Sequence, residues 1–197
     1  MSLAGLAALA SCMPPDDIEV VSEPLAAAPV VGIILQSSAT RPQLSGPVGL
    51  TVRVSGSEDR WIAGPGNPLE ARLQNGQVSL QIGGRAITGG LLRVSSPDSA
   101  GTVLLDGRAY RGTLELSGGG DGIVVVNRLD LEDYLVAVVG AEMGRRTPDE
   151  SSALEAQAVA SRTFALRHLD RDGIRGYDLL ADVSSQVYGG VASEMPQ

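Results

Sequence analysis

The chain has 197 residues, of which 43% are hydrophobic and 3% aromatic, and its formal net charge is -8 at pH 7. All 15 basic residues are arginine, and the chain has one cysteine and one histidine. A single cysteine excludes a disulfide-based fold, and one Cys with one His is too few ligands for a Cys/His zinc site. The acidic balance argues against nucleic acid as a main partner, because there is no basic excess to release phosphate counterions. We therefore expect chemistry based on carboxylates, hydroxyls, amides and arginine, without a metal or a cofactor.

The first twelve residues are apolar and uncharged, but a bilayer span needs roughly 20 residues. We interpret residues 1–12 as the end of a secretory leader, because the apolar run finishes in small residues. Within it, Leu9-Ala10-Ser11-Cys12 resembles the lipobox of bacterial lipoproteins, in which the cysteine is acylated. This resemblance predicts lipidation at Cys12 and an extracytoplasmic protein anchored to the membrane, in the cell envelope or periplasm. The alternative is a frayed apolar N-terminus.

Residues 13–29 are rich in proline, alanine and small polar residues, a composition typical of a flexible tether. The β-branched run Val30–Leu35 predicts the first strand, and Asn75-Gly76 and Asp106-Gly107 favour tight hairpin turns. We therefore predict an antiparallel β-rich region over residues 30–127. Its other predicted strands are Leu50–Val54, Val78–Ile82, Leu91–Val94, Val103–Leu105, Thr113–Leu116 and Ile123–Val126, and the glycine-rich run Ser117–Gly122 is predicted to be a turn.

Two helices are predicted after the β-rich region. Asp130 can cap a helix that runs to Met143 and ends at Gly144. A capping box of Thr147 and Glu150, with Pro148 at the first helical position, predicts a second, alanine-rich helix to about Leu169. The predicted fold class is thus α+β, with the candidate active site on the helical segment 128–197. The residues expected to be buried on the second helix are Leu154, Ala158, Phe164, Ala165 and Leu169.

Glu142 is the carboxylate that stands out in this segment. It lies four residues after Val138 and three after Val139, which places it on the apolar stripe of the first helix. Burial there would raise its pKa and keep it protonated, as a general acid for glycosidic bond cleavage requires. The alternative is that the last helical turn exposes Glu142 to solvent or pairs it with Arg145 or Arg146.

A series of spaced motifs in the second half of the chain resembles the stage II sporulation protein D (SpoIID)/LytB amidase-enhancer family. The motifs are Tyr110-Arg111-Gly112, Val125–Leu135, Val138–Met143, Ala153–Leu166, Tyr177-Asp178-Leu179 and Ser185–Gly190. Together they cover about 80 residues. Compared with the family, the chain looks truncated at its C-terminus, because a Ser/Gly/Thr-rich motif and a Trp-Gly are expected beyond Gly190.

The resemblance implies a cell-envelope protein acting on peptidoglycan glycan strands. One branch of the family is a lytic transglycosylase that cleaves the bond between N-acetylmuramic acid and N-acetylglucosamine, and its catalytic Glu corresponds to Glu142. A single carboxyl group suffices for that mechanism, unlike the two of most glycosidases. The other branch is described as a non-catalytic enhancer of a wall amidase, an N-acetylmuramoyl-L-alanine amidase. Both remain open, and so does an inactive fragment.

The resemblance also implies substrate-binding or Glu-positioning roles for residues in the family's motif stretches. These candidates are Gln157, Arg162, Gln186 and Tyr188. Three of them also have a structural alternative: an ion pair with a helix acid for Arg162, backbone contacts for Gln157 and a place in the core for Tyr188. Glu132 is a second carboxylate that matches the family's motif. The expected partners are glycan strands, a wall amidase and, through the lipid anchor, a membrane.

Overall fold

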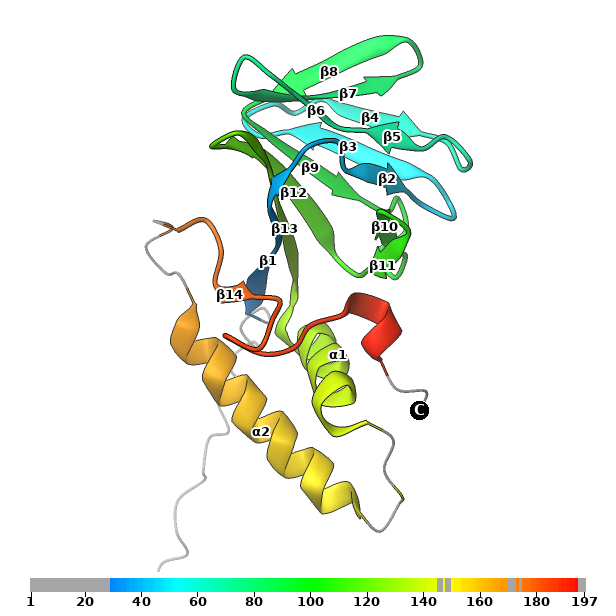
Figure 1. Cartoon of the computed structure of the whole chain (residues 1–197). Coiled ribbons are helices and arrows are strands. Elements are labelled where there is room, and N and C mark those ends of the chain that lie inside the picture. The colour runs from blue at the N-terminus through cyan, green and yellow to red at the C-terminus, as the bar shows by residue number, and fades with distance from the viewer. Residues whose placement is uncertain (1–28, 145–146, 148–149, 170–172, 174, 195–197) are drawn as a thin grey trace, which may run out of the picture.

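The computed structural model describes residues 29–144, 147, 150–169, 173 and 175–194 of the chain (Figure 1). The predicted leader 1–12, its lipidation site Cys12 and all but the last residue of the tether 13–29 lie outside this part. Arg145 and Arg146, the alternative partners of Glu142, lie outside it as well. Antiparallel strands come first in the chain and two helices follow, which confirms the predicted α+β class.

A seven-stranded sheet forms the centre of the protein, in the order β14-β1-β13-β12-β9-β3-β4. All neighbouring strands are antiparallel except β14, which pairs with β1 in parallel. The bounds are β1 Val30–Ala39, β3 Leu50–Val54, β4 Arg60–Ala63, β9 Leu91–Ser95, β12 Thr113–Gly119, β13 Gly122–Asp130 and β14 Leu179–Leu180. The predicted strands in this sheet are all present, and β13 continues past residue 127, so the β-rich and helical parts share a strand.

Two smaller sheets complete the β-rich region. One has the order β11-β10-β2-β5, and the other the order β6-β7-β8. Their strands are β2 Gln43–Ser45, β5 Leu69–Glu70, β6 Arg72–Gln74, β7 Gln77–Ile82, β8 Arg85–Gly89, β10 Val103–Leu105 and β11 Arg108–Tyr110. Asn75 and Asp106 both have positive φ next to a glycine, as the predicted tight turns between β6 and β7 and between β10 and β11 require.

The prediction of a turn over the whole run Ser117–Gly122 is wrong. Gly118 and Gly119 extend β12, and only Gly120 and Asp121 form the connection to β13. Close backbone approach explains the glycine at position 118, because a Cβ there would lie 2.5 Å from the carbonyl oxygen of Gly76 in the β6–β7 turn. The glycines therefore let the long hairpin pass beneath the β6-β7-β8 sheet.

The two helices lie at the opposite end of the molecule from β7 and β8 (Figure 1). The first, α1, spans Leu131–Met143 and ends at Gly144 with φ 62°, close to the prediction. Asp130 precedes it in extended conformation but makes no side-chain capping bond. Five of its residues are buried against the sheet end and the C-terminal segment: Leu131, Tyr134, Leu135, Ala137 and Val138.

The second helix, α2, spans Ser151–His168, within the range predicted from the capping box. The Glu150 carboxylate accepts hydrogen bonds from the Thr147 backbone N–H (3.0 Å) and hydroxyl (3.1 Å). Fewer residues of α2 are buried than the sequence predicted: only Ser161 and Ala165 are buried, and of these only Ala165 was predicted. The other predicted core positions are half-buried (Leu154, Ala158, Phe164 and Leu169), because α1 is the main helix or strand that α2 packs against.

The segment after α2 returns to the sheet and joins the helices to it. The Gly32 backbone N–H donates to the Asp178 carboxylate at 2.6 Å, just before β14 pairs with β1. The chain then passes α1 and forms a short 3-10 helix, η2 (Gly190–Ser193). Within the described part of the chain, no helix is long and apolar enough to cross a membrane.

Candidate functional site

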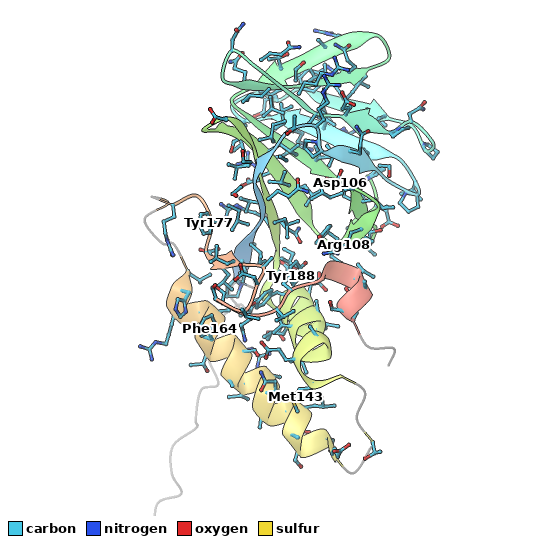
Figure 2. All side chains as sticks on the ribbon, in the orientation of Figure 1. Asp106, Arg108, Met143, Phe164, Tyr177 and Tyr188 are labelled. Carbon is cyan, nitrogen blue, oxygen red and sulfur yellow. The ribbon has the colours of Figure 1, made fainter. Side chains whose placement is uncertain are left out.

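The predicted site residues are carried by three segments that meet around α1. Glu142 is in the last turn of α1, Gln157 and Arg162 are on α2, and Gln186 and Tyr188 follow β14. Figure 2 shows that Met143, which marks the end of α1, lies well away from Tyr188, which lies near its beginning. The candidates are therefore distributed along α1 and are not gathered around one atom.

Glu142 is in direct contact with Gln157. The Gln157 Nε2 donates a hydrogen bond to the Glu142 Oε2 and contacts the Ser161 Oγ at 3.3 Å. Ser161 is buried, so this contact fixes the amide of Gln157 on the side of α2 that faces α1. The second oxygen, Oε1, accepts no hydrogen bond from the described residues, so it is open to a ligand.

Of the two alternatives for Glu142, the structure shows exposure in the last helical turn and not burial on the apolar stripe. The side chain is exposed, and Val138, one turn earlier, is the last buried residue of α1. The apolar stripe does continue to position 142, but the last turn of α1 extends beyond the end of the sheet (Figure 1). Exposure makes the carboxylate accessible to a large polymeric ligand.

Gln186 contacts α1 through Tyr134. The fully buried Tyr134 donates from its hydroxyl to the Gln186 Oε1 at 2.8 Å. Burial raises the pKa of Tyr134, and the negative charge of Glu142 raises it further. The phenol is therefore neutral at physiological pH and remains a hydrogen-bond donor that holds the loop after β14 against α1.

Tyr188 lies in the core, as its structural alternative anticipated. It is 4% exposed, and its ring packs against Tyr134 and Tyr110 at centroid distances of 5.6 and 6.1 Å. Its hydroxyl donates to the Asn127 Oδ1 at 2.7 Å. Burial is the main reason that the pKa of Tyr188 is raised. Tyr188 still lines a cavity of about 430 Å³ together with Arg108 and Tyr177, and Figure 2 labels all three residues.

Arg162 forms the ion pair with a helix acid that was its alternative. Its Nε and Nη2 donate to the two carboxylate oxygens of Glu132 at 3.2 and 2.6 Å. Glu132 lies ten residues before Glu142 on α1, which corresponds to about 15 Å along the helix. That separation exceeds the roughly 5–9.5 Å between the two carboxyl groups of ordinary glycosidases. Glu132 therefore cannot be a second catalytic carboxylate for Glu142.

Two residues that support this arrangement were not singled out from the sequence. Asn127 is fully buried and donates to the carbonyl oxygens of Arg111 and Thr113 while accepting from Tyr188. Ser161 supports Gln157. The sequence did contain a signal for Asn127: a polar amide directly follows the apolar run Val124-Val125-Val126, where a buried side chain is expected. The described residues hold no group of three or more His, Cys, Asp or Glu side chains that could bind a metal ion.

Comparison with known proteins assigns this part of the chain. Residues 119–197 match the family model described as SpoIID, Stage II sporulation protein, and this range contains β13, both helices and every candidate residue except Cys12. An uncharacterized protein of Brachyspira hyodysenteriae is 39% identical over 87 residues, which are 44% of this chain and 23% of that protein. The chain thus spans about a quarter of the relative's length. No solved structure matches.

The family match confirms the resemblance found in the motifs, although Tyr110-Arg111-Gly112 lies just before the matched range. It indicates a protein related to the cell wall and to sporulation. Residues 119–197 of this chain are thus similar to the SpoIID family of stage II sporulation proteins.

Proposed function

We propose that this chain acts on peptidoglycan as a lytic transglycosylase, with Glu142 as the general acid and base. The observation that carries the proposal is an exposed carboxylate in the family's Glu-Met motif, held through one oxygen by Gln157. Because Glu132 is too far away to assist, the proposed mechanism needs a reaction that one carboxyl group can complete.

The lytic reaction meets this requirement. In the first step, the protonated Glu142 donates its proton to the oxygen of the bond between N-acetylmuramic acid and N-acetylglucosamine as that bond breaks. In the second step, the resulting carboxylate takes the proton of the sugar's own 6-hydroxyl, whose oxygen attacks the anomeric carbon. The products are a 1,6-anhydro sugar end and a free sugar end, and Glu142 is again protonated. Water is not consumed.

Gln157 is the positioning residue in this proposal. Its amide fixes the Glu142 Oε2, which leaves the Oε1 to transfer the proton. A Gln157→Leu variant keeps the size of the side chain but cannot donate, so we expect slower release of anhydro products with little change in substrate affinity. A fall in affinity at an unchanged rate would instead assign Gln157 to substrate binding.

The second candidate function is a non-catalytic enhancer of a wall amidase. One observation favours it: the outward face of α2 carries a small exposed apolar patch of Ala156, Val159 and Ala160, in which Val159 is 60% exposed. Such a face is typical of a protein interaction site. Incubating glycan strands free of stem peptides with the full chain, followed by mass analysis, separates the two functions. Anhydro ends support the enzyme, whereas their absence, together with faster hydrolysis of peptidoglycan that still carries its stem peptides by an added wall amidase, supports the enhancer.

The envelope location is also a proposal, supported by the lipobox-like sequence before Cys12. Expression in a bacterial host, followed by separation of membrane and soluble fractions, tests it. We expect the chain in the membrane fraction and the Cys12→Ala variant outside it. Equal distribution of the two proteins would contradict lipidation at Cys12.

A further inference from the structure

Three arginines form a row across one face of the central sheet. Arg53 on β3 is directly opposite Arg60 on β4 and directly opposite Arg93 on β9. Adjacent strands lie about 4.8 Å apart, so the three backbone positions fall within about 10 Å. Side chains at directly opposed positions lie on the same face of a sheet, and all three arginines are exposed.

This face is the outer one. On β3, Leu50 and Val52 are buried in the core, whereas Arg53 alternates with them and is exposed. The inner face of the sheet is covered by the β6-β7-β8 sheet, because β7 contacts β4, β9 and β12. Figure 1 shows β7 and β8 stacked on that side. The arginine row is therefore open to a ligand.

The positive charge of the row is largely uncompensated. Arg93 donates to Glu115 at 2.8 Å, and Glu115 also accepts from Arg128 at 2.7 Å, which in turn lies 3.9 Å from the Asp178 carboxylate. Arg53 and Arg60 form no ion pair with any described carboxylate. Like charges placed directly opposite each other destabilise a sheet. Such a row is unexpected in a chain with a net charge of -8, unless an anion completes it.

The row lines a cavity whose chemistry suits an oxyanion. The cavity measures about 350 Å³ and contains all three arginines together with hydroxyl side chains. The hydroxyl residues are Thr51, Ser95, Ser96 and Thr113. Guanidinium groups present planar sets of donors that match phosphate and carboxylate oxygens, and hydroxyls can add further donors. Arg93 also lines an adjoining cavity of about 600 Å³ with Arg128 and Glu115, where the Glu115 carboxylate accepts from both arginines, so the unpaired donors lie in the first cavity.

We propose that this outer face, defined as the arginine face (Arg53, Arg60, Arg93 and the hydroxyl residues of the cavity), binds a linear polymer of phosphate groups. A polymer is favoured because the donors are repeated along an open surface. A nucleic acid is disfavoured because the lining contains no aromatic side chain on which bases could stack. Trp61, which follows Arg60, packs against the core instead. This site is independent of Glu142 and of the proposed lytic reaction.

Calorimetric titration of the full chain with inorganic polyphosphate tests the proposal. We expect binding that weakens as salt rises, and a loss of about tenfold or more in affinity for the double variant R53Q/R60Q, since a hydrogen bond between charged groups contributes about 1.5–3 kcal/mol. The matched control is Arg85→Gln, which removes an exposed arginine of β8 outside the row and should change the affinity less than about twofold. Thermal unfolding without polymer should show no loss of stability in R53Q/R60Q, because the variant removes like-charge repulsion.

Several results would overturn the proposal. These are an absence of polyphosphate binding, equal affinity for the chain and R53Q/R60Q, an equal loss of affinity in Arg85→Gln, and binding of a single-stranded oligonucleotide or of polyglutamate at least as tight as that of polyphosphate. The last two ligands separate phosphate recognition from base stacking and from carboxylate recognition. Orthophosphate alone should bind more weakly than the polymer, and equal affinity per site would assign the face to a free ion.

Discussion

The hydroxyl of Tyr188 is expected to stabilise the junction between the sheet and the helices. It donates to the Asn127 Oδ1 at 2.7 Å, and both side chains are buried. A Tyr188→Phe change keeps the ring contacts with Tyr134 and Tyr110 but leaves the Asn127 Oδ1 without a donor. An unsatisfied buried acceptor costs about 1–3 kcal/mol, so we expect the free energy of unfolding to fall by about 2 kcal/mol.

Urea denaturation measures this loss as a lower midpoint with an unchanged slope. Tyr177→Phe is the matched control, because Tyr177 is half-buried and its phenol makes no hydrogen bond with a described residue. Its ring stays available to Arg175, whose guanidinium carbon lies 5.9 Å from the ring centroid. If Tyr188→Phe lowered the midpoint no more than Tyr177→Phe, the assignment of Asn127 and Tyr188 as a buried pair would be wrong.

Two further changes test the packing of the sheet. Burial would raise the pKa of Glu115, but hydrogen bonds from Arg128 and Arg93 outweigh it and lower the pKa. The stability that this group contributes is therefore present above its ordinary pKa and is lost as the pH falls through the lower folded value. Breaking a buried ion pair costs about 3–5 kcal/mol of stability, but the two arginines here are partly exposed. We therefore expect Glu115→Gln to lower the free energy of unfolding by about 1–3 kcal/mol. The stability of this variant should also depend less on acid pH than that of the unchanged chain. Gly112→Ala should lower the free energy of unfolding by about 2 kcal/mol or more, because φ is 73° and a Cβ would collide with the Arg128 carbonyl oxygen. Gly107→Ala is the control: its φ is 82° but the space around it is open, so it should lower the free energy of unfolding by about 1 kcal/mol. Chemical denaturation measures the free energy of unfolding of these variants, and equal losses of stability in Gly112→Ala and Gly107→Ala would contradict the clash at Gly112.

Local signals were sufficient to predict much of the fold. The strands Leu50–Val54 and Val103–Leu105 match β3 and β10, because short β-branched or leucine-rich runs between turn residues have few other stable conformations. The strands that were missed, such as β4 and β8, mix charged and apolar residues over four or five positions. Their pairing comes from tertiary partners, which a single strand's pattern does not reveal.

The candidate site could be predicted only in part. The motifs located Glu142 and Gln157, and the structure brings these two residues into contact. The helical stripe left burial and exposure of Glu142 both open, because spacing identifies a face of a helix but not where the neighbouring sheet ends. Asn127 was missed for a related reason: its three hydrogen bonds go to segments up to 61 residues away in sequence. The role of Glu142 itself stays a prediction.

The most direct test of the proposed function is the release of anhydro-muropeptides by the full chain and by its Glu142→Gln variant. General acid–base catalysis contributes about 10²–10⁴-fold, so we expect the variant to lose at least about 100-fold in rate with an unchanged unfolding midpoint, since Glu142 is exposed. Glu155→Gln, which removes an exposed carboxylate of α2, is the charge-matched control and should retain full activity. Undiminished anhydro product from Glu142→Gln would contradict the assignment of Glu142 as the catalytic group.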